Sequence, residues 1–423
     1  MANAVQKLFL LAACALANGI MMMTARAATD APIFVFGDSN ADVGTNNYLE
    51  ACTAKANHLY HGIDFPFSNP TGRFSNGKNI IDQIVRLLGN YKLSPPPFLS
   101  LLGHKPTYKR NIFQGANFAS GGAGIFWETG QKHFHEVITM EQQIQQLATI
   151  RTSMTQVLGS QKAVDDLLGS SIYIFHIGSN DLLEYVAAPV FDPAYLKQFV
   201  TNVTQAYAAH LTTLYELGAR KFAIIGIPPL GCAPATRVLN ATGGCADVMN
   251  ESARLFHIAM QSLLTNLSMT LKGFKYSLGN MYTVTMDAID NPRGNGFKEV
   301  KTACCGNGTT DCNVGVNLCS NRRDFLFWDK FHATEKASGL AALALVYAPN
   351  QQNEVLDSPN GAEIDEYNSL KLLRWPCIRN GVCWWCGAPP SFSKPSRSSK
   401  NSLKMVFQML TGAPEGFWSD YGI

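Results

Sequence analysis

The hydrophobic residues of the chain form short continuous runs, and the runs end in small or polar residues. The clearest cover residues 32–36, 171–177 and 221–227, and residues 275–286 are expected to hold a final strand or strand pair. A continuous apolar run of this length is typical of a strand buried on both faces, as in a parallel sheet. Ser39 and Asn180 follow the first two runs, so they lie beyond the carboxyl ends of predicted strands. Open α/β sheets bind their ligands at that edge.

Segments with helical periodicity separate these runs. Apolar residues three and four positions apart predict helices over residues 80–88, 140–147, 160–168, 193–217, 248–272 and 337–346. Asn76 and Thr334 are candidate caps for the first and last of these helices, and Gly89 ends the first. The alternation of strands and helices indicates an α/β fold, in which helices cover both faces of a parallel sheet.

Composition adds that the chain is globular and long enough for one large domain or two. Of its 423 residues, 46% are hydrophobic and 15% are charged, and the net charge is +3. The apolar content is sufficient for a sizeable core. The net charge is too small to indicate nucleic acid as a partner. Beyond the amino terminus, no stretch is long and apolar enough to predict a membrane span, and we expect a monomer.

The two ends of the chain differ from its centre. Lys7, an apolar stretch over residues 8–20 and the small-x-small sequence Ala25-Arg26-Ala27 predict a signal peptide over residues 1–27. Residues 349–423 are polar and irregular, so we expect a disordered tail or an aberrant one, translated from sequence that is not normally coding. A small appended domain is the alternative there. Residues 28–348 remain as one folded domain.

Secretion would give the cysteines an oxidising environment. Cys304, Cys305, Cys312 and Cys319 lie close together in a loop, and Cys232 and Cys245 flank another. Disulfides are predicted in both loops, with a pairing that the sequence does not determine. A zinc site in the first loop is the alternative, although its spacings differ from those of zinc ribbons. Sequons, which are candidate surface glycan sites, begin at Asn202, Asn240, Asn250, Asn266 and Asn307.

Ser39 is a candidate nucleophile, and a nucleophilic hydroxyl needs a base that is oriented by an acid. Of the nine histidines, His332 is the best candidate because Asp329 precedes it by three residues. One turn of helix-like chain would place both side chains on one side, where Asp329 can accept a hydrogen bond from the imidazole. His176 lies inside a strand run and is expected to pack in the core.

An acyl-transfer site also needs donors for the oxyanion that develops on the substrate. The candidates are the backbone N–H of Ser39, a backbone N–H of Gly121 or Gly122 in a glycine-rich turn, and the side-chain amide of Asn180. All follow predicted strands, because a short apolar element, expected to be a strand, runs into the glycine-rich turn within residues 114–124. We expect the donors to converge because the carboxyl ends of parallel strands share one edge. Asp38 is expected to hold the turn through bonds to nearby backbone N–H groups.

Four segments together resemble, in order, the four sequence blocks of the GDSL (SGNH-hydrolase) family of esterases and lipases. They are Phe36-Gly37-Asp38-Ser39 and residues 117–124, 177–181 and 327–332. Residues 62–66, 70–77, 228–234, 243–245 and 303–306 are similar to the secreted plant branch of that family. The resemblance covers about residues 32–347. Two positions depart from the family pattern: Asn40 stands in place of an apolar residue, and Ala333 in place of proline.

The resemblance implies a three-layer α/β/α sandwich with a central parallel sheet, a flavodoxin-like SGNH hydrolase, over residues 28–348. It also implies ester hydrolysis in two steps. Ser39 would attack the carbonyl, His332 would move the proton to the leaving alcohol, and Asp329 would orient His332. The N–H groups of Ser39 and Gly121 and the amide of Asn180 would hold the oxyanion. No metal or organic cofactor is implied.

The expected function is therefore that of a secreted, extracellular ester hydrolase of the apoplast or cell wall. Its substrate would be a small-molecule or lipid ester, namely acyl lipids or acylated cell-wall material. One alternative is an acyltransferase that uses the same three residues. Another is a non-catalytic member of the fold that binds carbohydrate or protein. The joint presence of Ser39, Asn180, Asp329 and His332 argues against the second, because packing alone does not require all four.

Overall fold

The fold is built on a five-stranded parallel sheet. The computed structural model describes residues 31–89, 93–188, 191–238 and 240–347. Within them the strands follow the order β2-β1-β3-β4-β5, and every neighbouring pair is parallel. The strands are β1 (Ile33–Gly37), β2 (Gly115–Asn117), β3 (Ile172–His176), β4 (Lys221–Ile225) and β5 (Lys275–Gly279). This confirms the predicted α/β class with a central parallel sheet.

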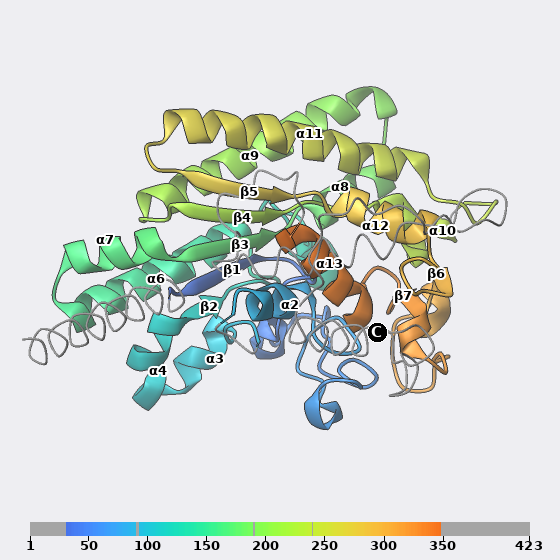
Figure 1. Cartoon of the computed structure of the whole chain (residues 1–423), viewed down its shortest axis with the longest axis horizontal. Helices are drawn as coiled ribbons and strands as arrows, with labels where there is room; N and C mark the ends of the chain where they lie inside the picture. Colours follow the sequence, from blue (N-terminus) through green and yellow to red (C-terminus); the bar gives the residue numbers. More distant parts are fainter. Residues whose placement is uncertain (1–30, 90–92, 189–190, 239, 348–423) are drawn as a thin grey trace, which may run out of the picture.

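Helices cover both faces of this sheet (Figure 1). They are α2 (Ile80–Leu87), α3 (Phe98–Gly103), α4 (Lys105–Asn111), α5 (Gln131–Phe134), α6 (Met140–Leu158), α7 (Gln161–Ser170), α8 (Ser179–Ala187), α9 (Leu196–Glu216), α10 (Pro234–Arg237), α11 (Asp247–Thr270), α12 (Met281–Asp290) and α13 (Glu335–Tyr347). Short 3-10 turns lie at Thr45–Tyr48, Pro66–Ser68, Ile112–Gln114, Pro193–Tyr195, Leu230–Cys232, Gly306–Gly308 and Arg322–Asp324.

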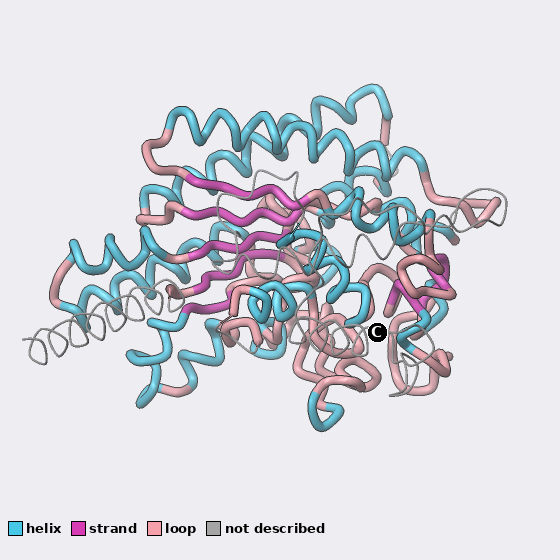
Figure 2. The backbone as a smooth tube through the Cα atoms, viewed as in Figure 1, coloured by secondary structure: helices cyan, strands magenta, loops and turns pink. Residues whose placement is uncertain are grey.

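Alternation along β1 explains why the sheet is buried on both sides. Phe34 and Phe36 pack into the core that contains α6, α7, α9 and α11. Ile33 and Val35 pack on the opposite face against α2, α12 and α13. Successive side chains of a strand point to opposite faces, so a strand between two helical layers must be apolar at every position. Figure 2 shows the longest loops gathered at the end of the sheet where the strands finish.

The edge of the sheet at β2 is short and is closed by prolines. The strand has three residues, and the N–H of Asn117 donates to Pro96 O at 2.9 Å. Pro97 forms an isolated parallel bridge with the same residue. Since proline has no N–H, regular strand pairing stops there.

A second, two-stranded sheet carries the cysteine-rich loop. It pairs β6 (Glu299–Ala303) with β7 (Phe325–Phe327) in parallel. Disulfides join Cys304 to Cys319 and Cys305 to Cys312, and another joins Cys232 to Cys245. The predicted disulfide-closed loops are confirmed, and the zinc alternative is wrong because all four cysteines of the first loop are oxidised in pairs.

Three local predictions were wrong or incomplete. Residues 281–286 belong to α12 and not to a strand, since Asn280 caps a helix there by accepting the N–H of Thr283 at 3.0 Å. The helix that begins at Met140 continues to Leu158 and ends at Gly159, which has a left-handed conformation. Asn79, and not Asn76, caps α2 through a reciprocal pair of bonds with Asp82.

Asn76 acts on the last helix instead, together with Thr334, which was predicted as the cap there. The Oγ1 atom of Thr334 accepts the N–H of Ala337 at 3.2 Å, which confirms Thr334 as a cap of α13. Asn76 Oδ1 accepts the N–H of Glu335 at 2.8 Å, so it satisfies the first N–H of the same helix. The loop before α2 is thereby tied to the start of α13.

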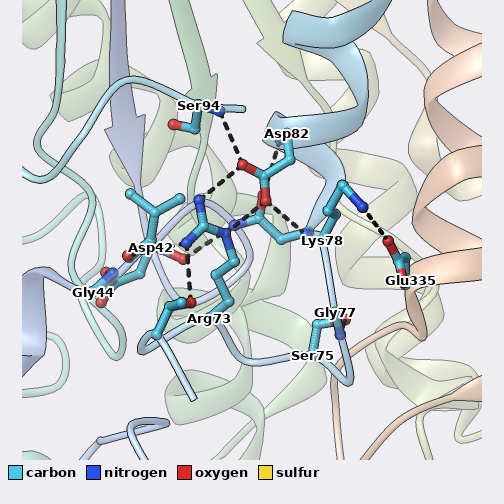
Figure 3. Close-up of polar contacts among 12 residues, drawn as sticks. Asp42, Gly44, Arg73, Ser75, Gly77, Lys78, Asp82, Ser94 and Glu335 are labelled. Atoms are coloured by element: carbon cyan, nitrogen blue, oxygen red, sulfur yellow. Dashed lines mark hydrogen bonds and ion pairs between the residues drawn. The ribbon is translucent and has the colours of Figure 1, made fainter. Parts of the chain in front are cut away.

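A buried ion pair fixes this loop to α2 (Figure 3). Arg73 donates from Nε and Nη2 to the two oxygens of Asp82, at 2.6 and 2.9 Å. Both side chains are almost fully buried. Asp82 also accepts the N–H groups of Asn79 and Ser94, so its carboxylate is saturated with donors.

Two of the expected regions are not covered by these ranges. The signal peptide (1–27) and the tail (349–423) lie outside the described residues, and the folded domain of 28–348 is described over residues 31–347 with its short gaps. Among those residues we find no helix with the length and hydrophobicity needed to cross a bilayer.

Candidate active site

Ser39 lies in the tight turn that follows β1. Gly37 is required at the end of this strand, because a Cβ there would lie 2.5 Å from His176 O. The main chain then turns through bonds from the N–H groups of Ala41 and Asp42 to Asp38 O. The side chain of Asp38 accepts the N–H of Asn40 at 3.0 Å, which confirms that Asp38 holds the turn. Ser39 remains partly exposed at its tip.

Ser39, His332 and Asp329 form one hydrogen-bonded chain. Ser39 Oγ and His332 Nε2 are 2.8 Å apart. His332 Nδ1 lies 2.8 and 2.9 Å from the two carboxylate oxygens of Asp329. Asp329 Oδ1 also accepts the backbone N–H groups of Phe331 and His332, both at 2.9 Å, which creates the turn that brings the two side chains together. The spacing of three residues predicted this arrangement.

Electrostatic interaction between Asp329 and His332 keeps the Asp329 carboxyl ionised and makes His332 a stronger base. Burial alone would raise the pKa of Asp329, but the imidazole and its hydrogen bond hold that pKa well below the ordinary value. Burial alone would lower the pKa of His332, but the Asp329 carboxylate raises it above the ordinary value. His332 is therefore a stronger base than an isolated imidazole, as a group that accepts the proton of a serine hydroxyl must be.

Trp328 fixes the main chain of the candidate base, His332, through a backbone hydrogen bond. The N–H of Trp328 donates to His332 O at 2.7 Å, and its carbonyl accepts the N–H of Cys305 at 2.8 Å. Its indole Nε1 donates to His61 Nδ1 at 3.1 Å. Burial lowers the pKa of His61 to about 4, so its ring is neutral and can accept this bond. Sequence reasoning missed His61, because 267 residues separate it from Trp328.

The glycine-rich turn and Asn180 are joined to one another. Asn180 Nδ2 donates to Ala123 O at 2.9 Å, and its second amide hydrogen has no partner among the described residues. The N–H of Ser120 donates to Gly37 O at 3.1 Å, so the turn is also attached to the strand before Ser39. The N–H of Gly121 donates to Asp42 Oδ2 at 3.0 Å. This bond engages the group that was expected to bind the oxyanion.

Two further polar residues at this edge have structural roles. Asp181 accepts the N–H groups of Ile125 and Phe126 and the hydroxyl of Thr129, so it fixes the loop after the glycine-rich turn. His176 is buried as predicted, and its ring nitrogens have no hydrogen-bond partner within the described part of the chain. Burial lowers the pKa of His176 to about 4, so its ring is neutral. In the described residues there is no cluster of histidine, cysteine or carboxylate side chains suited to a metal ion.

The sequons differ in accessibility. Asn202, Asn266 and Asn307 are exposed, and Asn240 is half-buried. Asn250 is buried, and its Oδ1 accepts the N–H of Gly231 at 2.9 Å. A glycan needs a side-chain nitrogen at the surface, so Asn250 does not fit the predicted role, and the other four stay predictions.

Comparison with known proteins gives a consistent result. Residues 33–345 match the family described as GDSL-like Lipase/Acylhydrolase. Three GDSL esterase/lipases of Arabidopsis thaliana are each 36% identical to this chain, over 315, 326 and 330 residues. These alignments cover 73%, 74% and 76% of this chain and 86% of each relative.

Proposed function

The chain belongs to the GDSL-like lipase/acylhydrolase family and is a carboxylic ester hydrolase, and from this premise we propose that it works through Ser39, His332 and Asp329. The observation that carries the proposal is the 2.8 Å contact between Ser39 Oγ and His332 Nε2, with Asp329 bonded to the other ring nitrogen. Acyl transfer needs a nucleophile that is hydrogen-bonded to a base, with the base in turn oriented by an acid.

In the first step Ser39 Oγ attacks the ester carbonyl while His332 Nε2 takes the hydroxyl proton. Asp329 stabilises the imidazolium that forms and keeps the remaining proton on Nδ1. Collapse of the tetrahedral intermediate breaks the bond to the alcohol, which leaves with the proton from His332. In the second step His332 Nε2 takes a proton from a water molecule as the water oxygen attacks the acyl-enzyme carbonyl. Collapse of this second tetrahedral intermediate breaks the bond between the acyl carbon and Ser39 Oγ. His332 returns its proton to Ser39 Oγ, and the carboxylic acid is released.

The negative oxygen of each tetrahedral intermediate needs hydrogen-bond donors fixed before the reaction. We assign this role to the N–H of Ser39, the side-chain amide of Asn180 and an N–H of the glycine-rich turn. The bond between Asn180 and Ala123 O supports the assignment, because it attaches the amide to that turn. The bond from the N–H of Ser120 to Gly37 O likewise attaches the turn to the strand that precedes Ser39.

We further propose that the protein is secreted and acts on acyl lipids or acylated cell-wall material. Three disulfides in the described residues support an oxidising compartment. Transfer of the acyl group to an alcohol in place of water would use the same residues. The organised contact between Ser39 and His332 disfavours a purely binding role, which does not need it.

The test uses 4-nitrophenyl esters of increasing acyl length with the wild-type protein and Ser39→Ala. We expect turnover by the wild type and its loss in the variant, and equal rates in both would contradict the proposal. The preferred acyl length then separates short acyl substituents from lipid chains. Adding an acceptor alcohol and measuring the transesterified product separates transfer from hydrolysis.

A further inference from the structure

The glycine-rich turn beside Ser39 has a defined geometry. Residues 120–123 form a β-turn that is closed by the N–H of Ala123 on Ser120 O, at 3.1 Å. Gly122, the third residue of the turn, has a φ of 90°. A positive φ at that position is typical of a type II turn and favours glycine there. The turn lies against the base, since a Cβ on Gly121 would meet the ring of Phe74, whose centroid is 5.0 Å from that of His332.

Asp42 fixes the first peptide of this turn. Its fully buried carboxylate accepts the N–H of Gly121 at 3.0 Å through Oδ2. Through Oδ1 it accepts the N–H groups of Gly44 and Thr45, both at 2.7 Å. Asp42 thus joins the chain that follows Ser39 to a turn 79 residues away. The one N–H hydrogen of Gly121 is committed to this bond.

Asn46 fixes the next peptide, between Gly121 and Gly122. Its Nδ2 donates to Gly121 O at 2.9 Å, and its Oδ1 accepts the hydroxyl of Ser120 at 2.6 Å. This peptide is trans, and in a planar trans peptide the carbonyl and the following N–H point in opposite directions. Because the Gly121 carbonyl is held toward Asn46, the N–H of Gly122 points away from it. That N–H has no hydrogen-bond partner among the residues that the structure describes.

We propose that Asp42 and Asn46 are positioning residues that orient this peptide, so that the N–H of Gly122, and not that of Gly121, binds the oxyanion. The inference rests on the proposed function, because an oxyanion forms there only during acyl transfer. Neither side chain touches the substrate. Both act by presenting one backbone donor at a fixed angle before the reaction begins, which is the condition under which such donors accelerate it.

The decisive variant is Asn46→Asp, which keeps the shape of the side chain but replaces the donor to Gly121 O with a second acceptor. We expect kcat on a 4-nitrophenyl ester to fall about 10- to 100-fold, since a loosened oxyanion donor approaches the loss of one. We expect KM to change much less, because the ground-state carbonyl is bound weakly. Asp42→Asn, which loses the acceptor for Gly121, should behave in the same way.

Phenylboronic acid gives a readout that a general loss of structure would not imitate. Its boron becomes tetrahedral and anionic when Ser39 Oγ bonds to it, so it resembles the intermediate. We expect its affinity for both variants to fall by about the same factor as kcat. Asn250→Ala is the matched control, because Asn250 also accepts a buried glycine N–H, that of Gly231, at a different strand end. Its kcat and boronate affinity should stay near those of the wild type.

Two results would overturn the proposal. One is that both variants, folded by circular dichroism, keep wild-type kcat and boronate affinity. The other is that kcat per folded molecule is unchanged and only the folded fraction falls. In either case the loss of turnover in Ser39→Ala would still support the hydrolase mechanism. If the wild type itself shows no turnover that depends on Ser39, the proposed function fails instead.

Discussion

Ser39 Oγ and His332 Nε2 lie 2.8 Å apart although 293 positions separate the two residues in the chain. The turn after the first strand supplies the nucleophile, and the loop before the last described helix supplies the base. This contact therefore forms only when the loop before α13 has folded back over β1. Two hydrogen bonds hold it there: the N–H of Glu335 donates to Asn76 Oδ1, and the N–H of Trp328 donates to His332 O.

Asp329→Asn should lower kcat by about 10³- to 10⁴-fold with little change in KM, because the amide cannot orient and stabilise the imidazolium as the carboxylate does. The pH profile should also move. Activity needs neutral His332, so it rises with pH through the pKa of that residue, which Asp329 raises. In any residual activity of the variant, the acidic limb should shift to lower pH. An unshifted limb would mean that His332 is not the base.

Asn180→Ala should lower kcat by about 10²- to 10³-fold, which corresponds to the loss of one oxyanion donor. KM for the same ester should change little, since the amide binds the transition state more strongly than the substrate. Steady-state kinetics on one aryl ester measure both constants. Gln198→Ala removes an exposed amide from α9 and serves as the control. A variant whose defect lies only in KM would argue for a role in substrate binding.

Arg73→Met should destabilise the protein by about 3–5 kcal/mol, because it leaves the buried carboxylate of Asp82 without its cation. Adding Asp82→Asn to the same protein should recover part of the loss. Urea denaturation followed by circular dichroism gives the free energy of unfolding of each variant. Lys162→Met removes an exposed ion pair with Asp166 and should have little effect. Equal, small effects for both single variants would show that the buried pair is not important for stability.

Asp38→Asn should change how stability depends on pH. Burial raises the pKa of Asp38 from the ordinary 3.8 to about 7. Between these values the folded state keeps a proton that the unfolded chain has lost, so the carboxyl lowers stability as the pH rises. The variant has no such group, and its stability should exceed that of the wild type by a growing margin from pH 4 to pH 7.

A tenfold difference in proton affinity between the folded and unfolded chain corresponds to about 1.4 kcal/mol, so the margin from Asp38 should reach the order of a few kcal/mol. Melting temperatures measured across this pH range for the wild type and the variant give the comparison. The amide retains an oxygen for the N–H of Asn40, so the turn should be preserved. Asp166→Asn, at an exposed carboxylate, is the control. A constant difference between wild type and Asp38→Asn over the whole range would refute the prediction.

The central strands β1, β3 and β4 were predictable because two helical layers bury nearly every side chain of such a strand. Residues 172–176 and 221–225 are apolar at nearly every place for that reason. Residues 281–286 misled the prediction, since Tyr282, Thr283 and Val284 favour strands in isolation. The cap that Asn280 provides, together with packing of Met281 against the sheet, makes them helical instead.

Within the site, the part that is local in sequence was predictable and the part that is distant was not. Asp329 and His332 share one turn, so their spacing indicated their contact. The contacts of Asp42 with Gly121 and of His61 with Trp328 cross 79 and 267 residues, and no periodicity carries such information. Choosing between Gly121 and Gly122 required the direction of one peptide plane, which only the folded chain has.

The proline-closed border at β2 has a consequence for behaviour in concentrated solution. An open sheet margin offers unpaired N–H and carbonyl groups onto which another chain can add a strand, which is how many native proteins begin to aggregate. Here Pro96 O accepts the backbone N–H of Asn117, the last residue of β2, and Pro97 has no N–H to donate to another strand. Addition of a strand from another molecule is therefore disfavoured at this margin by the prolines themselves, and charged side chains are not needed there for that purpose.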